Sequence, residues 1–343
     1  MTRLAKVANS GFSRSAGIAA RTVAFCVAWA VSAGALPAEG DGRWAILLAG
    51  VSGDAQLQKQ FYLALRTMRT TLIGPMAFPK DHVFVLADDP AVEPELVQAR
   101  STREGLEKVV REVAARAGKG DLVFVFIEGH GNFDNGVYKL NLVGPDPTAR
   151  DLAALFDALP PGRLVIVNAT PCSGGSVADL SRPGRILVTA TRSGHEKNRT
   201  RIGPYFVEAF SGAADADHNG RISLLEAFLF ARQKVEQHYT KEGSIQTEHA
   251  VLEDDSDGQG HDNPGPENGD GLIARTTYLD PAVRAGASSA EEETLARQAR
   301  ELEKKIEELR YAKSRMPEAE YERQLEELVV KLAEVNSRLR RKQ

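Results

Sequence analysis

Short apolar runs recur along the first two thirds of the chain and alternate with segments whose apolar residues follow a helical spacing. The runs are rich in β-branched, aromatic and leucine residues, which is typical of buried strands, and they lie at 44–51, 82–86, 122–127, 164–167 and 185–189. Apolar residues three and four positions apart predict helices at 55–72, 101–118 and 148–159. The alternation predicts an α/β fold, with a mostly parallel sheet, helices on both faces and right-handed crossovers.

The last part of the chain has a different pattern. After residue 286 there is no glycine, and Ala, Glu, Lys, Arg and Leu dominate. Two heptad-like apolar stretches are separated by Pro317, which a helix tolerates in its first turn but not in its interior. We therefore expect a domain at 43–275, a linker at 276–289 and a C-terminal α-helical hairpin at 290–343. The hairpin either packs on itself or on the domain, or it mediates self-association or the binding of a protein partner.

The N-terminus has the three parts of a secretory signal. Four basic residues precede the apolar stretch 22–36, and the small residues at 33–35 lie near the end of that stretch. The stretch is shorter than the roughly 20 residues of a spanning helix, so we expect a cleaved signal at 1–38 and no stable membrane span afterwards. An uncleaved anchor is the alternative. The prediction is a secreted or periplasmic protein.

Charge and motifs exclude several functions. The formal net charge of -4 gives no electrostatic case for nucleic acid. The chain has no glycine-rich phosphate loop, no serine-centred elbow and no histidines at zinc spacing, so we expect no organic cofactor.

One thiol and one imidazole follow neighbouring apolar runs. Cys26 lies in the predicted signal, so Cys172 would be the only cysteine of the mature chain. Cys172 follows the run 164–167 and His130 follows the run 122–127, and parallel neighbouring strands would bring both to one edge of the sheet. A thiol needs a base or a positive neighbour to act as a nucleophile, and His130 could supply it. The alternative is a buried, inert cysteine and a structural histidine.

Glycines next to both residues suit the same chemistry. Gly129 and Gly131 flank His130, and Gly174 and Gly175 follow Cys172, so backbone N–H groups could approach a substrate carbonyl.

Four stretches, in the order in which they occur along the chain, resemble the legumain-type cysteine peptidases of the caspase-like (clan CD) group. They are the opening strand at 44–50, the pair Asp88-Asp89 after the second strand, the strand closed by His130-Gly131, and the segment 172–176 after the next strand. The resemblance implies a caspase-like fold with Cys172 as the nucleophile and His130 as the acid that protonates the leaving amine. It also implies that the backbone N–H groups of Gly131 and Cys172 form the oxyanion hole.

The resemblance further implies an exported cysteine endopeptidase, or a transpeptidase that uses the same thioester acyl-enzyme, with a peptide or protein substrate. The segment 189–198 resembles the stretch that forms the specificity pocket, where Glu196 or Asn198 would contact a substrate side chain; the alternative is a polar surface loop. Three features depart from the family: Pro171 precedes the cysteine, Asn132 stands where serine is usual, and no pocket arginine matches. These departures leave open a non-catalytic caspase-like scaffold that binds a partner through its helical hairpin.

The segment 215–226 has the pattern of an EF-hand calcium loop. Oxygen-bearing side chains or backbone carbonyls at alternate positions suit a hard cation, and the predicted ligands are Asp215, Asp217, Asn219, Arg221 (through its carbonyl), Ser223 and Glu226. A helix at 224–239 would follow the loop, and a short helix at 204–210 would precede it. The pattern predicts one structural Ca²⁺, against the alternative of an acidic turn that only caps the next helix. A calcium-dependent structural protein of the envelope is a third possible function.

A second acidic and glycine-rich segment lies at 253–271. It lacks the glutamate that would end a calcium loop starting at Asp255, so a solvated loop is favoured over another ion site or a lid.

Overall fold

The computed structural model describes residues 42–160, 162–281 and 290–340. The predicted signal at 1–38 lies outside the described residues, and so does the segment 282–289 of the predicted linker. None of the helices in the described ranges combines the length and the apolar character that crossing a membrane requires.

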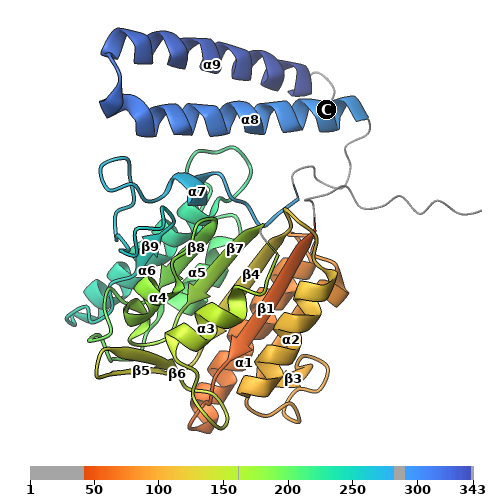
Figure 1. The fold of residues 1–343 in the computed structure, drawn as a ribbon, viewed down its shortest axis with the longest axis vertical. Coiled ribbons are helices and arrows are strands. Elements are labelled where there is room, and N and C mark those ends of the chain that lie inside the picture. Colours follow the sequence, from red (N-terminus) through yellow and green to blue (C-terminus); the bar gives the residue numbers. More distant parts are fainter. Residues whose placement is uncertain (1–41, 161, 282–289, 341–343) are drawn as a thin grey trace, which may run out of the picture. The chain divides into compact units, whose positions relative to one another are not determined.

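A seven-stranded sheet, in the order β3-β2-β1-β4-β7-β8-β9, forms the centre of the fold (Figure 1). All neighbouring strands are parallel except β9, which pairs antiparallel with β8. The strands are β1 Arg43–Ala49, β2 Val83–Ala87, β3 Ala99–Arg100, β4 Leu122–Glu128, β7 Arg163–Asn168, β8 Arg185–Thr189 and β9 Val251–Glu253. The five predicted strands are all present, and the predicted α/β fold with a mostly parallel sheet is confirmed.

Helices cover both faces of the sheet, as predicted (Figure 1). The first face packs against α1 Ala55–Ile73, α5 Ile202–Ala209 and α6 Leu224–Glu242. The second face packs against α2 Arg103–Arg116, α3 Ala149–Phe156 and the short α4 Val177–Leu180. Successive residues of a strand point to opposite faces of the sheet. Leu47 therefore packs in the hydrophobic core on the first face, and Ile46 and Leu48 pack in the core on the second face.

Side-chain caps explain where the helices begin. The carboxylate of Asp54 accepts hydrogen bonds from the N–H groups of Gln56 and Leu57, both at 2.8 Å, at the start of α1. Thr102 caps α2, so this helix begins two residues later than the sequence pattern predicts. Thr148 and Asp151 form a capping box at the start of α3.

A two-stranded hairpin follows β4 directly and is not among the elements predicted from the apolar pattern. Strands β5 Gly131–Asp134 and β6 Val137–Leu140 are antiparallel. Asn135 and Gly136, with φ of 48° and 78°, form the two-residue turn between them. The remaining short elements are the 3₁₀ helices η1 Lys80–His82, η2 Ser173–Ser176 and η3 Lys313–Arg315, and the helix α7 Leu272–Arg275.

The predicted C-terminal helical hairpin is present as α8 Ala290–Ala312 and α9 Glu318–Arg340. An ion pair of 3.8 Å between Arg338 and Glu291 joins the end of α9 to the start of α8, so the two helices are antiparallel. Pro317 directly precedes α9, where its missing N–H is not needed. The Tyr311 hydroxyl of α8 donates a 2.6 Å hydrogen bond to the carbonyl of Asp270, outside the hairpin.

Candidate functional site

Cys172 and His130 lie at the same edge of the sheet. His130 comes two residues after β4 and Cys172 four residues after β7. These strands are parallel neighbours, with Ile127 paired to Asn168 at their carboxyl ends. The sequence pattern therefore placed both backbone positions where an open α/β sheet binds ligands.

The Cys172 thiol is closed off from solvent. Cys172 is 1% exposed and packs in the core on the α2 and α3 face, which also contains Tyr138 and Val177. Burial raises the pKa of the thiol, and the positive charge of Lys197 and the backbone N–H of Phe133 only partly oppose this effect. The thiol is therefore protonated at neutral pH in this conformation, and a protonated thiol is a poor nucleophile.

The His130 imidazole faces the other side of the sheet. Its Nε2 lies 3.3 Å from the carbonyl oxygen of Ser52, and its ring makes an edge contact with Phe61 of α1 at 5.8 Å between centroids. Within the described residues, no hydrogen bond joins the His130 ring to the Cys172 sulfur. The predicted residues share a sheet edge, but they do not form an assembled dyad in this conformation.

The backbone at Cys172 is unusual for a residue with a side chain. Cys172 has φ 61° and ψ 3°, in the left-handed region, which non-glycine residues seldom adopt. Its N–H donates a 2.9 Å hydrogen bond to the carbonyl of Glu196, so the N–H that the family resemblance assigns to the oxyanion hole is already engaged. The neighbouring N–H of Gly174 donates to Thr191 Oγ1, also at 2.9 Å.

The β5–β6 hairpin covers the turn that contains Cys172. The Phe133 ring of β5 lies so close to Gly175 and Gly194 that a Cβ on either glycine would meet ring atoms at 2.6 Å and 2.2 Å. A Cβ on Gly131 would meet the carbonyl oxygen of Pro171 at 2.5 Å. These positions have to be glycine for the hairpin to pack this tightly. The hairpin therefore packs directly on the turn that contains Cys172, and the backbone N–H of Phe133 lies against the thiol.

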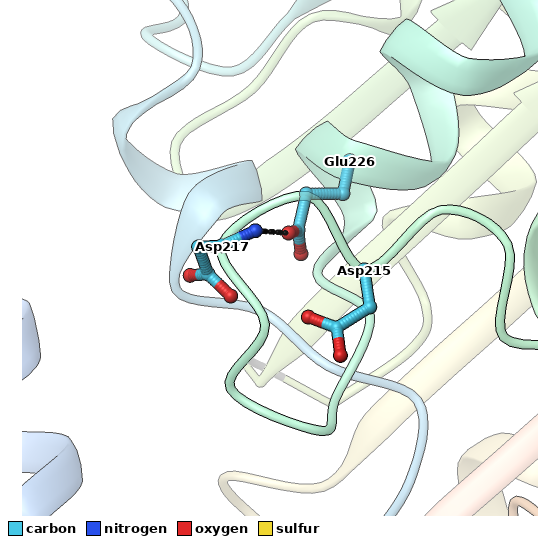
Figure 2. Close-up of side chains that lie close together, drawn as sticks. All are labelled: Asp215, Asp217 and Glu226. Atoms are coloured by element: carbon cyan, nitrogen blue, oxygen red, sulfur yellow. Dashed lines mark hydrogen bonds between the residues drawn. The ribbon is translucent and has the colours of Figure 1, made fainter.

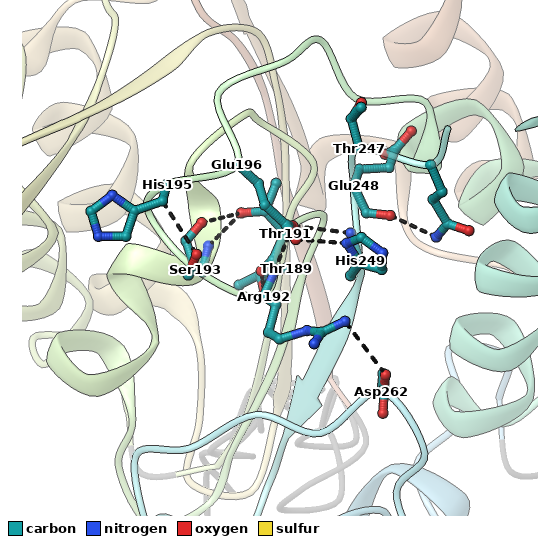
Figure 3. Close-up of polar contacts among 12 residues, drawn as sticks. Thr189, Thr191, Arg192, Ser193, His195, Glu196, Thr247, Glu248, His249 and Asp262 are labelled. Atoms are coloured by element: carbon teal, nitrogen blue, oxygen red, sulfur yellow. Dashed lines mark hydrogen bonds and ion pairs between the residues drawn. The ribbon is translucent and has the colours of Figure 1, made fainter. Parts of the chain in front are cut away.

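The two predicted substrate-contacting residues differ in their surroundings. The Glu196 carboxylate accepts 3.0 Å hydrogen bonds from the N–H groups of Arg192 and His249 (Figure 3). Its Oε1 also lies 2.6 Å from His249 Nδ1, so the Glu196 carboxylate links the loop after β8 to the segment before β9. Asn198 is exposed. A role of either residue in substrate binding stays a prediction.

A cavity of about 540 Å³ opens beside His130, between α1 and α5. Its lining includes Glu128, the last residue of β4, which is 8% exposed and faces Gly203 in the first turn of α5. Burial raises the pKa of Glu128 to about 8, and the charge of Arg199 opposes the shift. A neutral carboxylic acid beside an imidazole in a partly apolar cavity suits a polar ligand. Glu128 is not among the predicted site residues, although a charged residue at the end of an apolar strand is a visible signal in the sequence.

The predicted calcium loop gathers three carboxylates. One oxygen each of Asp215, Asp217 and Glu226 lies within 4.8 Å of the others (Figure 2). The Asp215 carboxylate accepts hydrogen bonds from the N–H groups of Asn219 and Gly220 at 3.1 and 3.0 Å, which wraps the loop around it. Burial, and then the neighbouring negative charges, raise the pKa of Asp217.

The remaining predicted ligands belong to the same turn. The Arg221 guanidinium pairs with Asp280 at 2.8 Å, which leaves its carbonyl as the group available to the loop. Ser223 and Glu226 form a capping box at the start of α6, with the Ser223 N–H and hydroxyl both 2.8 Å from Glu226 Oε2. The helix cap that the alternative interpretation requires is therefore present, and it coexists with a carboxylate arrangement that suits Ca²⁺.

Comparisons with known proteins give little sequence evidence. No family model matches the chain, and no curated protein matches it. Among solved structures, the crystal structure of the caspase drICE is matched with a TM-score of 0.36 and 12% identity, over 63% of this chain and 88% of that chain. The resemblance to legumains stays a prediction, and function has to be argued from the site.

Proposed function

We propose that this protein is an exported cysteine peptidase of the caspase-like type, and that its nucleophile is closed in the conformation described here. The observation that carries the proposal is the left-handed backbone of Cys172, next to the end of a parallel strand whose neighbour leads to His130. Such a conformation costs on the order of 1–3 kcal/mol and is concentrated at functional sites. A cysteine that only fills the core does not require a left-handed backbone conformation.

Opening of the β5–β6 hairpin would assemble the site. If Phe133 left the groove between Gly175 and Gly194, the thiol would lose the burial that raises its pKa, while the charge of Lys197 would still favour the thiolate. Peptide binding could supply the free energy for this movement.

The reaction on a peptide or protein substrate follows from the two side chains. With the proton of the Cys172 thiol transferred to His130, the thiolate attacks the carbonyl carbon of the scissile peptide bond. The protonated His130 then gives this proton to the departing amine as the C–N bond breaks. The resulting thioester is released by water, or by an amine if the protein is a transpeptidase. The proton removed from the attacking water returns to His130, which restores the starting state.

Calcium is part of the proposal as a structural ion in the loop 215–226. Support comes from the three carboxylates, from the Asp215 carboxylate that wraps the turn, and from α6, which begins in the same loop. The ion would fix the entry to α6, which packs on the same sheet face as α1 and α5.

A non-catalytic scaffold is the second candidate function. The 1% exposure of Cys172 and the hydrogen bond from its N–H to Glu196 favour it. In that case α9 would be a candidate contact surface for a protein partner, because Val329 and Val330 are 47% and 51% exposed.

Alkylation and cleavage distinguish the two functions. Iodoacetamide labelling at pH 7, mapped by mass spectrometry to Cys172, should be slow in the wild type and about tenfold or more faster in Phe133→Ala, because that substitution removes the covering ring. The exposed hairpin residue Val137 provides the control substitution Val137→Ala. Peptide-library cleavage should be lost in both Cys172→Ala and His130→Ala. If Cys172 stays unreactive in Phe133→Ala and no cleavage depends on Cys172, the scaffold function holds instead.

A further inference from the structure

A second group of carboxylates lies at the β9 edge of the sheet. It consists of Glu253, Asp255 and Asp270, here called the β9 acidic cluster, and one oxygen of each lies within 4.8 Å of the others. Glu253 ends β9 and is 1% exposed, Asp270 is fully buried, and Asp255 is exposed. The sequence favoured a solvated loop over 253–271, and the burial of Glu253 and Asp270 corrects that expectation.

One carboxylate oxygen of the cluster has no partner. Glu253 Oε1 accepts a 2.8 Å hydrogen bond from the Ser181 hydroxyl, but Glu253 Oε2 is buried and accepts none. The backbone N–H groups of Ser256 and Gly258 lie near the Glu253 carboxylate, but neither makes a hydrogen bond to Oε2. Burying an unpaired carboxylate oxygen costs free energy unless another group satisfies it.

The surrounding charges do not satisfy the cluster. In the part of the chain that the structure describes, its only ion pair joins Asp270 Oδ2 to His261 Nδ1 at 2.6 Å. The adjacent Asp254 is already used, because its carboxylate accepts 2.7 Å hydrogen bonds from the N–H groups of Gly271 and Ala274. The cluster therefore combines three carboxylates with one histidine ion pair, and one buried oxygen of Glu253 has no partner.

The backbone brings the two ends of the segment together. Gly269, with φ 90°, lies so close to Asp255 that a Cβ there would meet Asp255 Oδ2 at 2.2 Å. Leu252 and His261 exchange two backbone hydrogen bonds of 2.9 and 2.8 Å and close the intervening loop. Oxygen atoms from both ends of 253–271 thus surround one point.

We propose that Glu253, Asp255 and Asp270 bind a divalent cation, with Ca²⁺ as the ion that fits best. All the donors are oxygen atoms, they come from an irregular loop, and Ca²⁺ accepts six to eight such ligands, including backbone carbonyls and water. The ion pairs with the free oxygen of Glu253 and ties the segment 253–271 to the sheet edge. This site is separate in sequence from the loop 215–226 and does not depend on peptidase activity.

Calcium stoichiometry tests the proposal on the full chain. Protein stripped with chelator and dialysed against Ca²⁺ should bind two ions per chain, measured by elemental mass spectrometry. Glu253→Gln, which keeps the shape but removes the charge, should bind one, and so should Glu226→Gln in the loop 215–226. The double variant should bind none.

A carboxylate in the same segment provides the matched control. Glu267 is exposed, and Glu267→Gln should keep wild-type stoichiometry. If Glu253→Gln does not fold, Asp255→Asn at the exposed member of the cluster replaces it. The proposal is overturned if Glu226→Gln alone removes all bound Ca²⁺, or if the variants of the β9 acidic cluster bind as much Ca²⁺ as the wild type.

Discussion

Glu128 shows how burial changes a single carboxyl group at the candidate site. It ends β4, lines the cavity beside His130 and faces α5. The raised pKa of about 8 means that the folded protein retains a proton that the unfolded chain loses near its ordinary pKa of 4.5. Between these two values the unfolded state binds fewer protons, so the contribution of this group to stability falls as the pH rises.

The substitution Glu128→Gln should flatten this pH dependence. The wild-type free energy of unfolding should lose about 1.4 kcal/mol per pH unit through Glu128 in the window from about pH 5 to 8, and the variant should lack that contribution. Urea unfolding at four pH values measures the difference in slope between the two proteins. The exposed Glu236→Gln should keep the wild-type slope. Equal slopes for the wild type and Glu128→Gln would contradict the buried, protonated state.

For Cys172 and His130, the sequence predicted where the backbone places each residue, but not the direction in which each side chain points. Cys172 and His130 could be placed because an apolar run shows where each strand ends. The direction of the thiol depends on φ at Cys172 and on the packing of Phe133 against two glycines that are distant in sequence. A one-dimensional pattern contains neither, so the sequence could not decide between an accessible nucleophile and the buried cysteine of the alternative interpretation.

At the element scale, the long strands and helices were predictable because their apolar periodicity is strong. The missed strands β3, β5, β6 and β9 have two to four residues each, and long-range pairing decides whether such short segments become strands. The β5–β6 hairpin did leave a signal, because Asn135-Gly136 is a preferred two-residue hairpin turn.

The loop before α6 supports a prediction about calcium. Adding Ca²⁺ to chelator-treated protein should raise Tm, since a ligand present at 100 times its Kd adds about 2.7 kcal/mol of stability. Asp215→Asn removes the charge of the carboxylate that opens the loop and should make the Ca²⁺-dependent rise smaller, as measured by differential scanning fluorimetry. Glu236→Gln on α6 should keep the full rise. A rise in Asp215→Asn as large as in the wild type would mean that the loop only caps the helix.

At the scale of the whole molecule, the fold class and the C-terminal hairpin followed from composition and periodicity. The contacts between this hairpin and the rest of the chain could not be predicted in this way, because they depend on single polar groups. The Tyr311 hydroxyl reaches the carbonyl of Asp270, and Glu307 pairs with Arg275 of α7 at 3.1 Å. Both contacts link α8 to the segment that follows β9.

Removing the Tyr311 hydroxyl tests this link. Tyr311→Phe should lower the free energy of unfolding by about 1 kcal/mol and increase hydrogen exchange in 268–275, because the hydrogen bond to Asp270 is lost. Tyr321 of α9 stacks under Lys313, so Tyr321→Phe gives the matched control. Protection of 268–275 that is identical in both variants would show that the hydroxyl contact does not hold α8.

The outermost strand of the sheet has a further consequence. Both backbone hydrogen-bonding groups on the outer side of Leu252 in β9 are taken by His261 of the same chain, and the opposite edge strand, β3, is only two residues long. An exposed, unpaired edge is what allows two copies of a sheet to join into one continuous sheet, or to begin fibrous aggregation. In the described seven-stranded sheet, the loop that ends at His261 covers one edge and the two-residue length of β3 limits the other, so neither edge offers a second copy a long strand to pair with.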